Sequence, residues 1–355
     1  MRVFAALLAA VFVSLAPEAA LAERAAQSEI VEIQVPAPSL ASNLLGTPTV
    51  QPASVYLPPS YNHQRALHYP TLYLLHGYAD TRAAWLNYLG VKAILDRDIA
   101  GHRIPEVIVV MPDATNAYGG GFYVNSPVSG HWGDYITDDL MHYVDTHYRT
   151  LARPSARGLI GWSMGGFGAI HIAMERPGLY SAVYAISPCC LAPVEDLGAA
   201  SPAWSGVLAV HTQADVQAAA EHHDFYTVAA MALLTAISPD PNAAPLYVRI
   251  PFKEHDGQIA PDSAAYDHYQ QQFPLYRIAQ SRDALAGLRA FGMDYGFNDQ
   301  YAHIPPSVRA FSDRLSEYRI PHRFEAYDGD HRDHVAARLE TIVLPYVAGA
   351  LDAPQ

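Results

Sequence analysis

The sequence predicts an α/β fold in which a mostly parallel central sheet carries helices on both faces. Short, continuously apolar runs at Thr71–Leu75 and at 107–111 are typical of strands that are buried on both faces. These runs alternate with segments such as 135–148, whose apolar residues recur at helical spacing. Such alternation places the strands side by side in one sheet and the helices over its faces.

The same rhythm continues along the chain. A strand at 54–57 ends at Pro58 and Pro59, because proline has no N–H to donate to a sheet. We expect further strands at 157–160, 182–187, 288–293 and 322–327, and helices at 166–174 and 306–318.

The first residues have the pattern of a secretory signal peptide. Arg2 precedes an apolar run over 3–15, and Ala20-Leu21-Ala22 is a small-x-small cleavage site. The run is shorter than the roughly 20 apolar residues that a transmembrane helix needs. We therefore expect a signal peptide at 1–22, cleavage after Ala22, and a secreted or periplasmic protein without a stable membrane span.

The composition argues against a nucleic-acid partner. The net charge is −13, and the 22 Lys and Arg residues are scattered rather than grouped. A chain that neutralises phosphates needs clustered positive charge. We expect no nucleic-acid binding.

The segment Gly161-Trp162-Ser163-Met164-Gly165 joins a predicted strand to a predicted helix. A G-x-S-x-G sequence at such a junction is a nucleophile elbow, in which a sharp turn lifts the serine hydroxyl into a cleft. Glycine is needed on either side because strand and helix approach too closely for a side chain. The sequence therefore predicts an α/β-hydrolase fold with Ser163 as the nucleophile.

A serine nucleophile needs a histidine base and an acid that orients it, and in this fold they follow in the order serine, acid, histidine. His331 comes directly after the last predicted strand and is the expected base. Asp294 and Asp299 both follow the preceding strand. We favour Asp299 because it lies further into the loop; Asp294, at the strand end, remains the alternative or has a structural role in the turn.

Two backbone N–H groups must stabilise the oxyanion. The expected donors are the amides of Met164, after the nucleophile, and of Tyr78, in the loop that follows 71–75. His76 is expected to brace that loop rather than to act as a base. Aromatic residues near these loops are candidates for the substrate wall, with burial in the core as the alternative. The predicted substrate-binding residues are His76, Tyr123, Trp132 and Trp162.

Cys189 and Cys190 are adjacent and follow a predicted strand. Two buried thiols are expected, with a vicinal disulfide as the alternative. His222-His223-Asp224 and the 331–334 segment hold metal-ligand residue types without a recognised metal-site spacing. We predict no metal and no cofactor.

The Ala-rich segment 191–283 breaks the alternation and predicts a helical cap over the sheet edge. Helical stretches are expected at 214–221 and 227–236, and prolines punctuate the remainder. The predicted hydrolase core therefore consists of 23–190 and 284–355, with 191–283 as a lid insertion.

Four motifs together resemble the esterase D family. They are the LLHG sequence at 74–77, the GWSMGG sequence at 161–166, the turn from Asp294 to Asp299, and Gly329-Asp330-His331. The resemblance covers roughly 54–345, interrupted by 191–283. The family contains feruloyl and acetyl-xylan esterases, S-formylglutathione hydrolases, enterochelin esterases and antigen 85 mycolyltransferases.

The resemblance implies that Ser163 is the nucleophile, Asp299 the acid and His331 the base, with the amides of Tyr78 and Met164 as oxyanion donors. The leading interpretation is an exported carboxylic-ester hydrolase acting on a small-molecule or polysaccharide-linked ester. Acyl transfer to a sugar or lipid hydroxyl is the alternative within enzymes. A third hypothesis is a catalytically inactive binding protein of the cell envelope. The complete triad argues against it. The motifs do not specify the acyl group or the alcohol of the ester.

Overall fold

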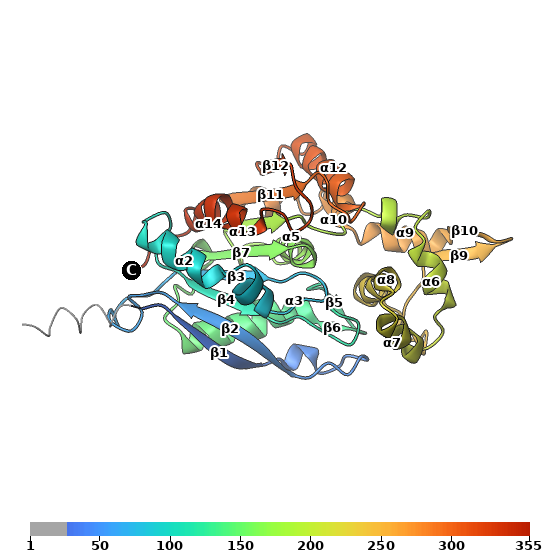
Figure 1. Ribbon diagram of the computed structural model, residues 1–355, viewed down its shortest axis with the longest axis horizontal. Helices are drawn as coiled ribbons and strands as arrows, with labels where there is room; N and C mark the ends of the chain where they lie inside the picture. The colour runs from blue at the N-terminus through green and yellow to red at the C-terminus, as the bar shows by residue number, and fades with distance from the viewer. Residues whose placement is uncertain (1–26) are drawn as a thin grey trace, which may run out of the picture.

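The computed structural model describes residues 27–355 and is built on an eight-stranded sheet (Figure 1). The signal-peptide prediction lies outside the described residues. The strands from β4 to β12 run parallel, while β1 and β2 are antiparallel at one edge. In sheet order the strands are β1 (Glu29–Pro36), β2 (Val50–Leu57), β4 (Ile108–Pro112), β3 (Thr71–Leu75), β7 (Arg157–Trp162), β8 (Ala182–Ile186), β11 (Ala290–Gly296) and β12 (Arg323–Tyr327).

The predicted α/β-hydrolase sheet with helices on both faces is confirmed. Every residue of β3, β4, β7, β8 and β11 is buried, which explains their continuous apolar runs. One apolar core holds residues of α4 (Met141–His147), α5 (Met164–Glu175) and α12 (Ile304–Glu317). The opposite face packs against α2 (Val91–Ala100), α13 (Val335–Arg338) and α14 (Leu344–Ala348).

Short elements complete this core. They are the π-helical turns η2 (Ala84–Tyr88), η3 (Tyr135–Leu140) and η6 (Leu339–Val343), the 3-10 turns η1 (Pro38–Leu40), η4 (Pro154–Ala156) and η5 (Glu195–Leu197), the helical turn α3 (Trp132–Asp134), and the hairpin of β5 (Asn125–Ser126) and β6 (Gly130–His131).

The observed elements include several that differ from expectation. Strand β1 and helix α2 were not predicted from the sequence. The strand expected at 288–293 runs instead over Ala290–Gly296, because its pairing with β8 and β12 continues past Met293. Asp294 therefore lies inside a buried strand and not in the loop beyond it, which decides its role below.

The segment 191–283, called the cap from here on, lies beside one end of the sheet (Figure 1). Its packed centre is a group of aromatic rings that includes Trp204, Phe252 and Tyr269, and its core is continuous with the α5 side of the sheet. Its predicted end at 283 falls inside α11. The cap elements are α6 (Ala203–Ala209), α7 (Gln213–Glu221), α8 (Phe225–Ile237), β9 (Phe252–His255), β10 (Gln258–Pro261), α9 (Ser263–Gln271), α10 (Pro274–Arg277) and α11 (Arg282–Ala286).

Over residues 27–355, none of the helices combines the length and the apolar character that crossing a membrane requires.

Candidate active site

Ser163 occupies the turn between β7 and α5 with strained backbone angles, φ 57° and ψ −116°. A non-glycine residue at positive φ is uncommon and is held there by its surroundings. The two flanking glycines provide that constraint. A Cβ on Gly161 would lie 1.9 Å from the Gly165 oxygen, and one on Gly165 would lie 2.0 Å from the Leu75 oxygen. The geometry is that of a nucleophile elbow.

The loop after β3 runs directly past this serine. A Cβ built on Gly77 would lie 3.5 Å from the Cβ of Ser163. The next amide, that of Tyr78, has no hydrogen-bond partner among residues 27–355. The amide of Met164 opens α5, where the first N–H groups lack partners within the helix. Both expected oxyanion donors therefore lie close to Ser163.

His331 is held in one orientation by an acid. Its Nδ1–H donates to Oδ2 of Asp299 over 2.7 Å, and both side chains are buried. The other carboxylate oxygen of Asp299 accepts the N–H of Tyr301 over 2.9 Å. With the proton fixed on Nδ1, the lone pair of Nε2 is available to accept a proton.

Packing completes the support of this histidine. The ring of Trp162 stacks on His331 with centroids 5.7 Å apart, and its indole N–H donates to the His331 carbonyl over 3.3 Å. The ring of Tyr301 meets the imidazole edge-on at 4.7 Å. Because Trp162 directly precedes the elbow serine, this packing brings His331 into the cleft that Ser163 also lines.

Asp294, the alternative acid, is engaged elsewhere. It is fully buried, and its Oδ2 accepts the Tyr184 hydroxyl over 3.0 Å and Nε of Arg338 over 2.9 Å. Burial raises the pKa of Asp294, and the Arg338 guanidinium opposes that shift. Asp294 anchors helix α13 to the sheet through Arg338, and it is Asp299 that hydrogen-bonds to His331.

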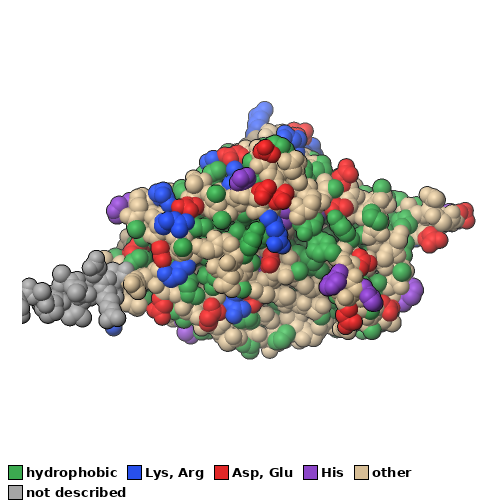
Figure 2. Space-filling view, viewed as in Figure 1, with side chains coloured by type: hydrophobic (Ala, Val, Ile, Leu, Met, Phe, Trp, Pro, Cys, Tyr) green, Lys and Arg blue, Asp and Glu red, His purple; other side chains and the backbone are tan. Residues whose placement is uncertain are grey.

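A cleft opens beside the elbow serine. Ser163, His331 and Tyr78 line it together with residues of the cap. Figure 2 shows hydrophobic side chains gathered on this face where the sheet layer meets the cap. Most lining side chains are apolar or aromatic, joined by a few charged groups. The apolar and aromatic members include Phe122, Trp162, Leu197, Phe225, Tyr226, Leu233 and Tyr301, and the charged members include Asp80, Asp196 and Arg332.

Phe225 of the cap connects two loops of the site. Its ring meets Tyr78 edge-on at 5.6 Å and stacks on Tyr301 at 5.6 Å. The first turn of α8 is thus in contact with both the oxyanion loop and the acid loop.

Three predicted substrate-binding residues are not in this cleft. His76, Tyr123 and Trp132 are fully buried behind the loops, whereas Trp162 does line the cleft. The Tyr123 hydroxyl donates to the His76 carbonyl over 3.1 Å, and the Trp132 indole donates to Ser129 over 2.9 Å. The prediction of substrate contact was wrong for these three, because aromatic rings near a loop also serve to pack the loop against the core.

His76 instead braces the oxyanion loop. Its Nδ1–H donates to the Gly77 carbonyl over 2.8 Å, and its Nε2 accepts the Ala114 N–H over 2.8 Å. Burial lowers its pKa, so the ring is neutral. The bracing role expected for this residue is the one that the structure shows.

The cleft also holds a group that sequence reasoning missed. Cys189, Cys190, Asp196 and His303 all line it. Burial lowers the pKa of His303, but the hydrogen bonds and charges of Asp196 and Cys189 together outweigh burial and raise the pKa to about 9. Burial raises the pKa of Cys189, while its contacts with Cys190 and His303 lower it to about 7. One signal could have found this group, since both segments leave the sheet at the edge that carries Ser163.

A family model described as "Putative esterase" matches residues 46–335, which is most of the chain. The chain therefore belongs to this esterase family, and the family resemblance seen in the sequence is confirmed.

Curated relatives match over a shorter stretch. An esterase of Mycobacterium tuberculosis is 33% identical over 134 residues, which are 36% of this chain and 27% of the relative. An endo-1,4-beta-xylanase/feruloyl esterase of Xylanibacter ruminicola is 30% identical over 138 residues, 38% of this chain and 19% of the relative. The match thus spans about a quarter or less of the length of these relatives.

Solved structures share the fold. A ferulic acid esterase superposes with a TM-score of 0.63 at 20% identity, covering 92% of this chain and 99% of its own. An S-formylglutathione hydrolase from Agrobacterium tumefaciens superposes with a TM-score of 0.57 at 18% identity, covering 92% and 96%.

Proposed function

We propose that this protein is an exported serine esterase that hydrolyses carboxylic esters through an acyl-enzyme on Ser163. The observation that carries the proposal is the Asp299–His331 pair, joined over 2.7 Å, whose histidine lines the same cleft as the strained Ser163. Membership of the esterase family and the names of the curated relatives support the same reaction.

The first half of the reaction forms the acyl-enzyme. Ser163 Oγ attacks the ester carbonyl carbon while Nε2 of His331 takes the hydroxyl proton. The negative charge that develops on the carbonyl oxygen is stabilised by the amides of Tyr78 and Met164. The intermediate collapses as His331 passes the proton to the leaving alcohol, so that an ester bond to Ser163 replaces the original one.

The second half releases the acid. His331 removes a proton from water, and the resulting hydroxide attacks the acyl carbon. Collapse returns the proton to Ser163 Oγ and frees the carboxylic acid. The Asp299 carboxylate holds the imidazole in place and stabilises the transient imidazolium.

The cleft favours an ester with an aromatic or otherwise bulky apolar group. Phe122, Trp162, Phe225 and Tyr301 give it aromatic walls close to Ser163. Offset and edge-on aromatic contacts favour a planar ring over a charged group in such a site. Relatives named as feruloyl esterases suggest the same class of substrate.

Export is proposed from the signal-peptide pattern at 1–22 alone. N-terminal sequencing of secreted or periplasmic material is expected to begin at Glu23, and recovery of intact Met1 would contradict it.

The test of the reaction is Ser163→Ala in the purified mature protein, assayed with p-nitrophenyl acetate and methyl ferulate. Loss of the nucleophile is expected to lower kcat by about 10⁴-fold or more. Ser129→Ala is the matched control, because the buried Ser129 hydroxyl has no side-chain partner within 27–355. A fluorophosphonate probe should label wild type but not Ser163→Ala. Wild-type turnover in the Ser163→Ala variant would rule out the proposed mechanism.

A further inference from the structure

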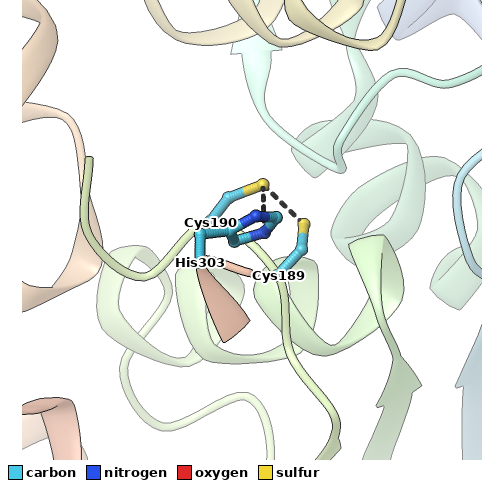
Figure 3. Close-up of side chains that lie close together, drawn as sticks. All are labelled: Cys189, Cys190 and His303. Carbon is cyan, nitrogen blue, oxygen red and sulfur yellow. Dashed lines mark hydrogen bonds between the residues drawn. The ribbon is translucent and has the colours of Figure 1, made fainter. Parts of the chain in front are cut away.

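Two thiols and an imidazole that the ester chemistry does not use meet in the wall of the cleft (Figure 3). Cys189 and Cys190 follow β8, and His303 immediately precedes α12, 113 residues after Cys190. The two Sγ atoms are 2.6 Å apart, and Nε2 of His303 is 4.0 Å from Sγ of Cys190. One ligand atom from each of the three residues lies within 4.8 Å of the other two.

We propose that Cys189, Cys190 and His303 form a binding site for a thiophilic divalent cation, with Zn²⁺ as its preferred occupant. Thiolate sulfur and imidazole nitrogen are the ligands that zinc prefers. Three protein ligands leave a fourth coordination position, which faces the cleft that all three residues line. The spacing between the cysteines and His303 explains why no local sequence motif reveals the site.

Asp196 supports this assignment by fixing the histidine. Its Oδ1 accepts Nδ1–H of His303 over 2.6 Å and the backbone N–H of the same residue over 2.8 Å. A metal-bound histidine commonly donates its other ring N–H to a carboxylate, which sets the tautomer and the ring orientation. Here the arrangement turns Nε2 toward the two sulfurs, as Figure 3 shows.

Binding requires a small rearrangement of the thiols. Two ligands about 2.3 Å from a tetrahedral zinc stand about 3.8 Å apart, so the sulfurs, now 2.6 Å apart, must separate by about 1 Å. Rotation about the Cα–Cβ bonds of Cys189 and Cys190 supplies this movement. A disulfide between them would remove both ligands, so the site exists only in the reduced protein.

The site is coupled to the nucleophile through the backbone. The N–H of Cys189 donates to the carbonyl of Ser163 over 3.2 Å. A cation on these ligands would occupy the wall of the cleft beside the elbow. If the esterase function proposed above holds, zinc is therefore expected to inhibit ester hydrolysis and not to support it.

The experiment titrates Co²⁺ into the full mature protein, reduced with a phosphine and kept anaerobic. One equivalent is expected to produce the intense charge-transfer absorption of a cobalt–thiolate bond, and Zn²⁺ is expected to displace it. Cys189→Ser and Cys190→Ser should each weaken this band, and the double variant should abolish it. Asp196→Asn should lower the affinity by about 10- to 100-fold while the band remains.

His222→Ala/His223→Ala is the matched control, because this exposed pair on the cap could bind cations without the cleft. It should titrate like wild type. Circular dichroism checks that each variant is folded, and His303→Gln provides a loss-of-ligand test that leaves both thiols in place. Binding by the double cysteine variant equal to wild type, or no charge-transfer band in reduced wild type, would overturn the site.

The effect on ester hydrolysis is measured separately. Added Zn²⁺ is expected to inhibit wild type strongly and the folded Cys189→Ser/Cys190→Ser variant at least tenfold less. Absence of any ester turnover would count against the proposed function alone, since the cobalt titration does not depend on it. Equal inhibition of both proteins would contradict the coupling.

Discussion

Replacing Asp299 by asparagine should place the proton of His331 on the wrong nitrogen. In the wild type, one carboxylate oxygen of Asp299 accepts the Tyr301 N–H over 2.9 Å and the other accepts Nδ1–H of His331 over 2.7 Å. An asparagine would keep its oxygen toward Tyr301, because only an oxygen can accept that N–H. Its NH₂ group would then face Nδ1 and donate to it. His331 would carry its proton on Nε2 and could not accept one from Ser163.

The expected loss in kcat for Asp299→Asn is about 10⁴-fold, equivalent to about 5.4 kcal/mol of transition-state stabilisation. KM should change little, because the tautomer matters in the transition state and not in substrate binding. Asp299→Ala removes the orienting acceptor without supplying a competing donor, and Trp162 and Tyr301 still pack on the ring. We therefore expect Asp299→Ala to keep more activity than Asp299→Asn.

Asp294→Asn should lower the stability of the fold without a large effect on catalysis. Removing this buried charge weakens the pair with Arg338, which still holds Glu325 over 2.8 Å. Stability should fall by about 3 kcal/mol, the lower end for a broken buried pair, as measured by urea denaturation. The kcat of the folded fraction on p-nitrophenyl acetate should stay within a few-fold of wild type. A large kcat loss in Asp294→Asn together with a mild one in Asp299→Asn would refute the assignment of the acid.

Three further outcomes follow from the same geometry. Gly165→Ala should fail to give soluble protein, since its methyl would lie 2.0 Å from a carbonyl oxygen of β3. The control Gly178→Asn should fold normally, because Gly178 has a φ of +78° and no heavy atom near its Cβ position, and asparagine tolerates positive φ. The free energy of unfolding should decrease as the pH is lowered below about 6.5, because burial lowers the pKa of His76 and the unfolded chain then binds a proton that the folded chain does not. Denaturation of His76→Gln should show a smaller decrease in stability between pH 7 and pH 5 than the wild type. A decrease equal to that of the wild type would contradict this. Phe225→Ala and Leu233→Ala, which enlarge the cleft, should change the ratio of long-chain to acetyl ester turnover while acetyl hydrolysis survives, and an equal loss on all esters would show a merely structural role.

The sequence pattern predicted those parts of the protein whose structure depends on residues close together in the chain. Continuous apolar runs marked β3 and β4 because strands covered on both faces have no solvent side. The elbow was readable because the close approach of β7 and α5 admits only glycine beside Ser163. Strand β1 was missed because, at the sheet edge, only its Ile33 and Val35 are buried and it forms no continuous apolar run.

The residues that line the cleft could not be predicted from the sequence pattern in the same way. Tyr123 and Trp132 have the same chemistry and the same nearness to active loops as Phe122 and Trp162, yet the first two are core and the last two line the cleft. What separates them is the direction of each side chain, and that direction depends on distant partners. Tyr123 turns inward because its hydroxyl reaches the His76 carbonyl, 47 residues away.

The predicted residues Ser163 and His331 and the unpredicted group of thiols and imidazole all lie at the carboxyl edge of the sheet. Parallel strands deliver the residues that follow them to one edge, and this rule brings Ser163, His331 and the Cys189–Cys190 pair to the same cleft. The rule also reaches His303, which immediately precedes the helix after the acid loop. Sequence order alone therefore selects the edge, and the tertiary contacts of each side chain decide which groups act together. In this protein those contacts give one edge two sets of reactive groups, Asp299–His331 beside the elbow and Asp196–His303 beside the thiols.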